Sequence, residues 1–243
     1  MLISPSKATF FPEYIPRAFI ASTAEANQAT NYEQVIPLLK KYGVSVVDGR
    51  DFFLARKASS TEPLFSKSGT HWTRYGACLM TAQLVEQIAK ERKETLRAPK
   101  CDDVRIASVP EGEDRDLADL TNLWNKRVFY QPLAYPKADN RVKMPNDLHA
   151  LIVGDSFSWG LLHIMNDQQL VKGYDFYYYF QTHYKPDYSS TPVADEPKDA
   201  LKQTLADHNL VIVEANEAAL GDMGFGFVGE AVGELQSKIT PER

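Results

Sequence analysis

The chain has 243 residues, which is enough for one α/β domain with a sizeable hydrophobic core. Hydrophobic residues make up 44% of it and charged residues 24%, as in ordinary globular proteins. The formal net charge of -5 and the sequence pI of about 5.6 exclude the strongly basic surface that binds nucleic acid or an anionic membrane. An acidic substrate would have to be held by local lysine or arginine side chains.

The chain carries no targeting signal that the sequence reveals. No stretch is long and apolar enough to span a bilayer, and Met1–Ser4 lack the basic region and apolar run of a signal peptide. These first residues have the pattern of the end of a core strand. We therefore expect residues 1–243 to be a single domain, excised from a longer protein whose export signal or anchor lies elsewhere.

The first half of the chain alternates short apolar runs with amphipathic helical patterns. This predicts a three-layer α/β fold with a central, mostly parallel sheet. The expected elements are a helix over residues 23–41 that begins at Thr23, a buried strand over 44–48 and a long helix over 73–96. Residues 97–148 are less regular, with a helical pattern only at 114–124 and prolines after it.

The second half begins with the clearest strand pattern of the chain, residues 148–153. After it we expect a tyrosine-rich strand near 174–180, a loop over 184–198, a helix over 197–207 and a last core strand at 210–213. No internal repeat or low-complexity segment is present, so one domain is the economical interpretation.

The two cysteines, Cys78 and Cys101, have neither metal-ligand nor redox spacing. Cys78 lies in an apolar helical pattern, so we expect it to be a buried small hydrophobic residue. The alternative is a disulfide between the two, which only their distance in the fold can decide.

An apolar strand ends in Gly154-Asp155-Ser156, and a predicted helix follows. Ligands of open α/β sheets bind beyond the carboxyl ends of the strands, so the Ser156 hydroxyl is expected to face that crevice. The helix that follows offers backbone N–H groups to a developing oxyanion, and Gly154 allows a tight turn and the close approach of an acyl group. The alternative is an ordinary helix N-cap, where Asp and Ser are common.

His71 lies in a loop just before the long predicted helix, beside Trp72 and with Thr73 as a candidate N-cap. A serine nucleophile needs an adjacent base, and an imidazole suits that role near neutral pH. The alternative is a loop histidine with Trp72 packed in the core. Because His71 and Ser156 both fall at loop-to-helix junctions, we predict that Ser156 is a nucleophile and His71 its base.

The histidine and serine segments also resemble the motifs of a known family. Thr70-His71-Trp72-Thr73 with Gly76-Ala77 resembles "D-T-H-W-T-x-x-G-A", and Gly154-Asp155-Ser156-Phe157 resembles "G-D-S-[FY]", both of the alginate O-acetyltransferase family (AlgJ/AlgX type). The histidine motif precedes the serine motif, as in this family and unlike most SGNH esterases. Three more segments are similar in the same order: residues 5–16, 43–48 and, more weakly, 214–217.

The resemblance implies an SGNH-hydrolase-like catalytic domain of an exported or membrane-anchored protein in the periplasm. It implies an O-acetyltransferase that moves an acetyl group through an acetyl-serine onto hydroxyls of an exported polysaccharide. The partners implied are the polysaccharide acceptor and a small acetyl donor or acetylated protein, with a membrane-bound acetyl-transfer protein as one candidate. The alternatives are a carbohydrate acetylesterase with the same Ser/His site and a catalytically silent polysaccharide-binding module.

The chain departs from the family at one position of the catalytic triad. The family's carboxylate stands two residues before the histidine, where this chain has Gly69. Three alternatives follow: a dyad in which a backbone carbonyl or Ser68 orients His71, a substituted triad with another carboxylate such as Asp48 or Asp51, or an impaired enzyme. We expect Asp155 to brace the nucleophile turn and not to be the missing acid.

Trp72, Arg74, Trp159 and Tyr179 are the candidate substrate-binding residues. An aromatic ring stacks on sugar rings, and Arg74 with Lys67 could contact an anionic sugar. Tyr179 belongs to an aromatic run that is more typical of a half-buried strand than of a sugar-binding surface. The remaining histidines show no ligand spacing, and the sequence has no Gly-rich phosphate loop, so we expect neither a metal nor a cofactor.

Overall fold

A computed structural model of the protein describes residues 1–18, 29–139 and 144–237. In these ranges a seven-stranded sheet has the order β2-β1-β9-β5-β6-β7-β8, and β3 and β4 form a separate antiparallel pair. The strands from β2 to β6 in that order are parallel, and β7 and β8 extend the sheet in antiparallel fashion. The strands are β1 (Leu2–Ser4), β2 (Val47–Asp48), β3 (Val104–Ala107), β4 (Leu133–Pro136), β5 (Asn146–Gly154), β6 (Val171–Tyr178), β7 (Thr182–Tyr184), β8 (Ser190–Pro192) and β9 (Leu210–Asn216).

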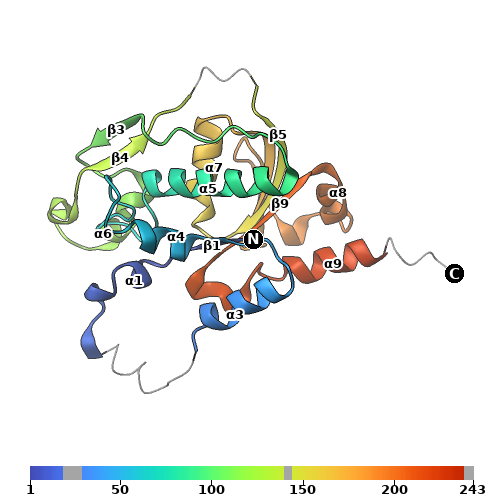
Figure 1. Cartoon of the computed structure of the whole chain (residues 1–243), viewed down its shortest axis with the longest axis horizontal. Helices are drawn as coiled ribbons and strands as arrows, with labels where there is room; N and C mark the ends of the chain where they lie inside the picture. The colour runs from blue at the N-terminus through green and yellow to red at the C-terminus, as the bar shows by residue number, and fades with distance from the viewer. Residues whose placement is uncertain (19–28, 140–143, 238–243) are drawn as a thin grey trace.

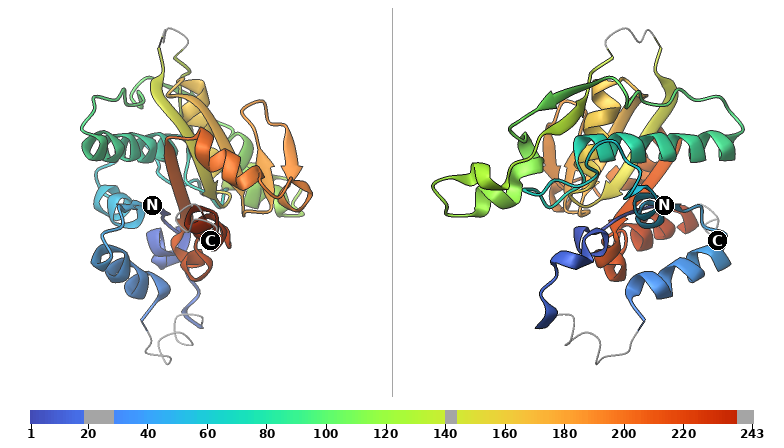
Figure 2. Two further views of the ribbon diagram at one scale, coloured as in Figure 1. Left: turned by 90° about the vertical axis from the view of Figure 1, so that its right-hand side faces the viewer. Right: turned by 60° about the vertical axis from the view of Figure 1, so that its left-hand side comes forward.

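Helices cover both faces of the sheet (Figures 1 and 2), which confirms the predicted three-layer α/β fold. Alternate residues of β5 point to opposite faces: Ile152 belongs to an apolar cluster with residues of α1, α4, α5 and α7, whereas Val153 belongs to one with residues of α8 and α9. A third apolar cluster joins α3 to β1 and β9. The α-helices are α1 (Lys7–Phe10), α3 (Asn31–Lys41), α4 (Gly49–Arg56), α5 (Arg74–Arg92), α6 (Asp116–Leu120), α7 (Ser158–Asp167), α8 (Ala200–Asp207) and α9 (Phe227–Ser237).

Several predicted boundaries differ from the observed ones. The helix α3 begins only at Asn31, because Thr30 caps it in a reciprocal capping box with Glu33; Thr23 lies outside the described residues. The strand predicted for 44–48 is only Val47–Asp48, and α5 ends at Arg92. Where a helix was expected over 114–124, a 3₁₀ turn (Gly112–Arg115) leads into the short α6.

Cys78 and Cys101 are disulfide-bonded, so the interpretation of Cys78 as a free buried residue is wrong. The apolar pattern around Cys78 was correctly recognised, since its side chain is fully buried in the main core. Cys101 packs against the same core from the segment that precedes β3. The bond therefore ties α5 to the start of the irregular middle segment.

The middle segment forms one end of the molecule. The β3–β4 pair and α6 lie at the left of Figure 1, and the segment around α6 projects from the body in the right-hand view of Figure 2. It nevertheless returns to the body, because the Ala118 N–H donates to the Ser68 carbonyl (3.0 Å), just ahead of His71. No helix within the described ranges has the length and apolar character needed to cross a bilayer.

Candidate active site

Ser156 lies in the turn between β5 and α7, beyond the carboxyl end of the central strand of the seven-stranded sheet. Gly154 is required there for packing, not for access by an acyl group as the sequence suggested. A β-carbon at this position would lie 2.2 Å from Ser158 Oγ and 2.7 Å from Glu214 Oε2. The space beside Gly154 is thus filled by polar side chains that support the turn.

Two buried carboxyl groups support this turn from below. Asp155 accepts hydrogen bonds from the Phe157 N–H (2.9 Å) and the Asn216 N–H (2.8 Å), which agrees with its expected bracing role. Glu214 accepts from Ser4 Oγ (2.6 Å) and Ser158 Oγ (2.9 Å). Burial, reinforced by the neighbouring Asp155 charge, raises the pKa of Glu214 well above its usual range, which favours the neutral carboxyl.

The loop that carries His71 is held firmly at both ends. Phe65 and Trp72 form an isolated antiparallel bridge, and the Thr73 N–H donates to the Leu64 carbonyl (2.9 Å). Thr73 is the N-cap of α5, as predicted, and accepts from the Gly76 N–H (3.0 Å). This framework fixes where the chain leaves the loop and enters the helix.

The structure brings the two predicted catalytic side chains together. His71 Nε2 lies 2.8 Å from Ser156 Oγ, although the residues are 85 positions apart. The His71 ring also meets the ring of Phe157 edge-on, with centroids 4.9 Å apart. Both side chains are partly exposed, so a small substrate can reach them. The arrangement has the geometry of a hydroxyl nucleophile beside its general base.

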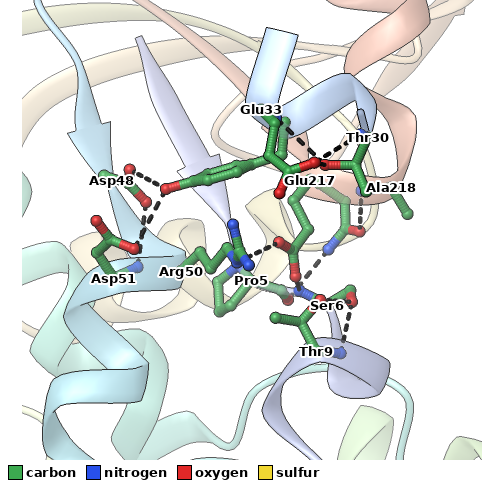
Figure 3. A network of polar contacts seen from close by, with 12 residues as sticks. Pro5, Ser6, Thr9, Thr30, Glu33, Asp48, Arg50, Asp51, Glu217 and Ala218 are labelled. Carbon is green, nitrogen blue, oxygen red and sulfur yellow. Dashed lines mark hydrogen bonds and ion pairs between the residues drawn. The ribbon is translucent and has the colours of Figure 1, made fainter. Parts of the chain in front are cut away.

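The groups suggested as substitutes for the missing acid at position 69 are engaged elsewhere. Asp48 and Asp51 both accept from the Tyr32 hydroxyl (2.6 and 3.3 Å), and Asp48 also caps α4 (Figure 3). The Ser68 hydroxyl donates to the Asp114 carbonyl (2.8 Å). The same figure shows Arg50 paired with Glu217 (3.3 Å), which in turn accepts from the Ser6 N–H (2.7 Å). This network joins the ends of β1, β2 and β9.

A carboxylate that the sequence analysis missed lies beside His71. Asp116 Oδ2 is 3.0 Å from His71 Nδ1, on the side of the ring opposite Ser156. The pair approaches closely, but the ring N–H is not well aligned with the carboxylate oxygen. Catalytic hydrogen bonds are often loose without substrate. The sequence offers only a weak hint of this position, the acid-rich stretch 111–119 together with the glycine at the family's acid position.

Two of the predicted substrate residues, Trp72 and Arg74, differ in their access to a ligand. Trp72 is only 3% exposed and packs against Phe53 and Phe157, so it presents no open face for a sugar. Arg74 lies near Glu113 and Asp114. Burial raises the pKa of both carboxyl groups, and the positive charge of Arg74 opposes this rise. Burial nevertheless raises the pKa of Asp114 to about 6. Trp72 thus has a packing role, whereas Arg74 is partly exposed and stays a candidate for substrate contact.

Trp159 and Tyr179 remain near the nucleophile and partly exposed. Trp159 is on α7, three residues after Ser156, and packs with Phe176 and Tyr184 (centroids 5.0 Å from each). The Tyr179 N–H donates to the Gly154 carbonyl (2.9 Å), which places this residue at the same sheet edge as Ser156. Its ring packs with those of Tyr178 and Phe225. These two side chains stay candidates for substrate contact.

Comparison with known proteins identifies the family. The sequence profile of the SGNH hydrolase-like domain of acetyltransferase AlgX matches residues 1–163 of this chain, which include both His71 and Ser156. The chain belongs to this family. As a member of an acetyltransferase family it is an enzyme of acetyl transfer, and the resemblance noted from its motifs is confirmed. No curated protein matches the sequence significantly.

Solved structures of low sequence identity share the fold. The O-acetyltransferase domain of Pseudomonas putida AlgJ is similar with a TM-score of 0.53 and 19% identity, over 90% of this chain and 74% of that one. Bacillus cereus PatB1 has a TM-score of 0.51 and 14% identity, over 90% and 82% of the two chains. A DHHW family protein from Eubacterium siraeum has a TM-score of 0.53 and 12% identity, over 94% and 80%.

Proposed function

We propose that this protein is a serine-dependent O-acetyltransferase that modifies hydroxyl groups of an exported polysaccharide outside the cytoplasm. The observation that carries the proposal is the 2.8 Å contact between Ser156 Oγ and His71 Nε2, at the sheet edge where α/β enzymes bind ligands. Membership in an acetyltransferase family indicates that the group transferred is an acetyl group.

The reaction has two halves. In the first, Ser156 Oγ bonds to the acetyl carbonyl carbon while its proton passes to His71 Nε2; the bond to the leaving group then breaks, and His71 returns the proton to that group. In the second, a sugar hydroxyl gives its proton to His71 and attacks the acetyl-serine, and Ser156 recovers its proton as the ester forms. The Ser156 backbone N–H stabilises the oxyanion in both halves.

The proposed partners are a polysaccharide acceptor and an acetyl donor. The donor is a small acetyl compound or an acetylated protein, with a membrane-bound acetyl-transfer protein as a candidate. Trp159 lies about one helical turn after Ser156 on α7, and Tyr179 follows β6, the strand beside β5. Aromatic rings pack against the apolar faces of sugars. Trp159 and Tyr179 are the residues proposed to contact the acceptor.

The two alternatives have different standing. An acetylesterase would use the same residues with water as acceptor, so only the product distinguishes it. A catalytically silent binding module was suggested by the missing acid at Gly69. That motivation is weakened, because the Asp116 carboxylate lies 3.0 Å from His71.

The test is Ser156→Ala, assayed with p-nitrophenyl acetate and with a polysaccharide acceptor. Removing the nucleophile of such a site lowers kcat by about four orders of magnitude or more. Mass spectrometry of the wild-type enzyme after brief exposure to the donor should find one acetyl group on the peptide that contains Ser156. Ser189→Ala, an exposed serine in the β7–β8 loop, is the matched control and should keep wild-type turnover.

Undiminished turnover in Ser156→Ala would show that the proposed function is wrong. Release of free acetate in preference to acetylated polymer, with acceptor present, would instead identify an acetylesterase. Retained glycan binding without turnover or Ser156 acylation in the wild-type protein would identify the binding module.

A further inference from the structure

We propose that Asp116 is the positioning residue for His71, a carboxylate supplied from α6 in place of the one that the family carries two residues before the histidine. This inference deepens the proposed function and rests on it. It assigns a role to a segment that is remote from both catalytic motifs in the sequence and that projects from the body of the fold (Figure 2).

The first observation is the placement of the Asp116 carboxylate. Its Oδ2 atom lies 3.0 Å from His71 Nδ1, while Oδ1 accepts from the Thr70 N–H (2.7 Å) and the Leu117 N–H (2.6 Å). The Thr70 bond ties the carboxylate to the loop residue that directly precedes the base. Asp116 is thus restrained through one oxygen while the other lies beside the imidazole.

The second observation explains why the acid is not at position 69. A β-carbon on Gly69 would lie 2.6 Å from the Glu113 carbonyl oxygen and 2.8 Å from the Asp114 carbonyl carbon. These are backbone atoms of the turn that leads into α6, so a side chain at 69 and the observed position of α6 exclude each other. Gly69 therefore lacks the carboxylate of the family but leaves space for the segment that carries Asp116.

The third observation is that α6 is anchored to the histidine loop at several points. Ser66 and Ser68 both donate to the Asp114 carbonyl (2.5 and 2.8 Å), and the Ala118 N–H donates to the Ser68 carbonyl (3.0 Å). The Lys7 ammonium also donates to the Gly69 carbonyl (2.6 Å). Burial lowers the pKa of Lys7, and the negative charge of Asp116 opposes this lowering. A carboxylate on such a braced turn can hold a ring in one orientation.

The proposed role is to orient the imidazole and stabilise its charge. A proton on Nδ1 that faces Asp116 leaves the Nε2 lone pair directed at Ser156 Oγ, which is the tautomer a base needs. When Nε2 takes the serine proton, the nearby carboxylate stabilises the imidazolium. Asp116 itself transfers no proton.

The test is Asp116→Asn with p-nitrophenyl acetate. We expect kcat to fall by about 100- to 10,000-fold, with KM changed by less than about threefold. A loss confined to kcat separates positioning of the base from a loss of substrate binding. Asp119→Asn, on the same helix and paired with Arg115 at the surface, is the matched control and should match the wild type.

A measurement on the wild-type enzyme covers the case in which Asp116→Asn does not fold. Nitrogen NMR of ¹⁵N-histidine-labelled protein should find neutral His71 protonated on Nδ1, and protonation on Nε2 would overturn the inference. Gly69→Ala, with Asp116 intact, should lose activity because the new methyl group displaces the α6 turn. If Asp116→Asn turns over at the wild-type rate while Ser156→Ala is inactive, the inference is wrong and the proposed function stands; activity in Ser156→Ala would remove both.

Discussion

His71 and His183 each have a side chain within 3.0 Å of both ring nitrogens, yet the two sites differ in chemistry. His71 lies between a hydroxyl, Ser156 Oγ at 2.8 Å, and a carboxylate, Asp116 at 3.0 Å. His183 lies between two carboxylates, Asp175 at 2.6 Å and Glu196 at 2.5 Å. Burial alone would lower the pKa of His183, but these two partners outweigh it and raise the pKa.

The difference shows what a histidine needs if it is to act as a base. A ring that faces carboxylates through both nitrogens is stabilised as the imidazolium, with both N–H groups donating and no lone pair left to accept a proton. A ring that faces a hydroxyl on one side keeps that lone pair directed at a nucleophile. The His183 site therefore joins β6 and β7 to the segment before α8, whereas the His71 site has the geometry that the proposed proton transfer requires.

The largest expected effect separates the two histidines by activity. His71→Ala should lower kcat for p-nitrophenyl acetate by about four orders of magnitude, because the serine loses its base. His183→Ala, assayed on protein shown to be folded, should stay within about threefold of the wild type, since its ring touches neither Ser156 nor Asp116. Comparable losses of kcat in the two folded variants would break the comparison.

Sequence patterns could locate His71 and Ser156 because each lies at a local landmark. Ser156 follows an apolar strand, and His71 precedes the N-cap of a long helix, so strand and helix signals alone place both at the ligand-binding edge of the sheet. The resemblance in motif order added the chemistry. The three-layer fold was equally accessible, because a parallel sheet is built from alternating apolar runs and amphipathic helices.

Asp116 could not be found in this way, because its position depends on tertiary docking. It lies in an irregular segment whose turn packs onto Gly69, and no periodicity records such a contact. The same holds for Trp72, whose burial against Phe53 and Phe157 cannot be distinguished by sequence from exposure in a cleft. The disulfide also depends on the path of the chain between Cys78 and Cys101, which the helical pattern around Cys78 does not reveal.

A smaller effect is expected in stability at the second histidine site. Asp175 accepts from both His183 (2.6 Å) and His208 (2.9 Å), so Asp175→Asn should leave two largely buried imidazoles without their shared anion. Loss of one member of a buried ion pair costs about 3 kcal/mol of unfolding free energy. The measurement is urea denaturation at pH 6, followed by circular dichroism.

The matched control for that variant is Asp147→Asn. Asp147 forms an exposed pair with Lys172 (2.7 Å) next to the same strands, and pairs of that kind contribute about 1 kcal/mol or less. Equal destabilisation by the two variants would mean that the His183 site is no more than a surface charge cluster.

The smallest expected effect is a dependence of this stabilisation on pH. The hydrogen bond to Asp175 raises the pKa of His208, and the two carboxylates raise the pKa of His183. The contribution of these two histidines to the free energy of unfolding is therefore complete below about pH 6.5 and is lost as the pH rises through their folded-state pKa values. Burial opposes ionisation of Asp175, but the hydrogen bonds from His183 and His208 outweigh it and lower its pKa. Its contribution is therefore present above about pH 4 and lost in stronger acid.

The difference in Tm between the wild type and Asp175→Asn should accordingly be largest between about pH 4 and pH 6.5 and shrink as the pH rises further. Each kcal/mol lost corresponds to about 2–4 °C in a chain of this size. Tyr177, whose hydroxyl is 3.3 Å from Glu196, does not disturb the range, because burial raises its pKa to about 12. A Tm difference that stays constant from pH 5 to 9 would mean that His183 and His208 bind Asp175 as neutral rings, and the contrast with His71 would then lie in access to a hydroxyl and not in charge.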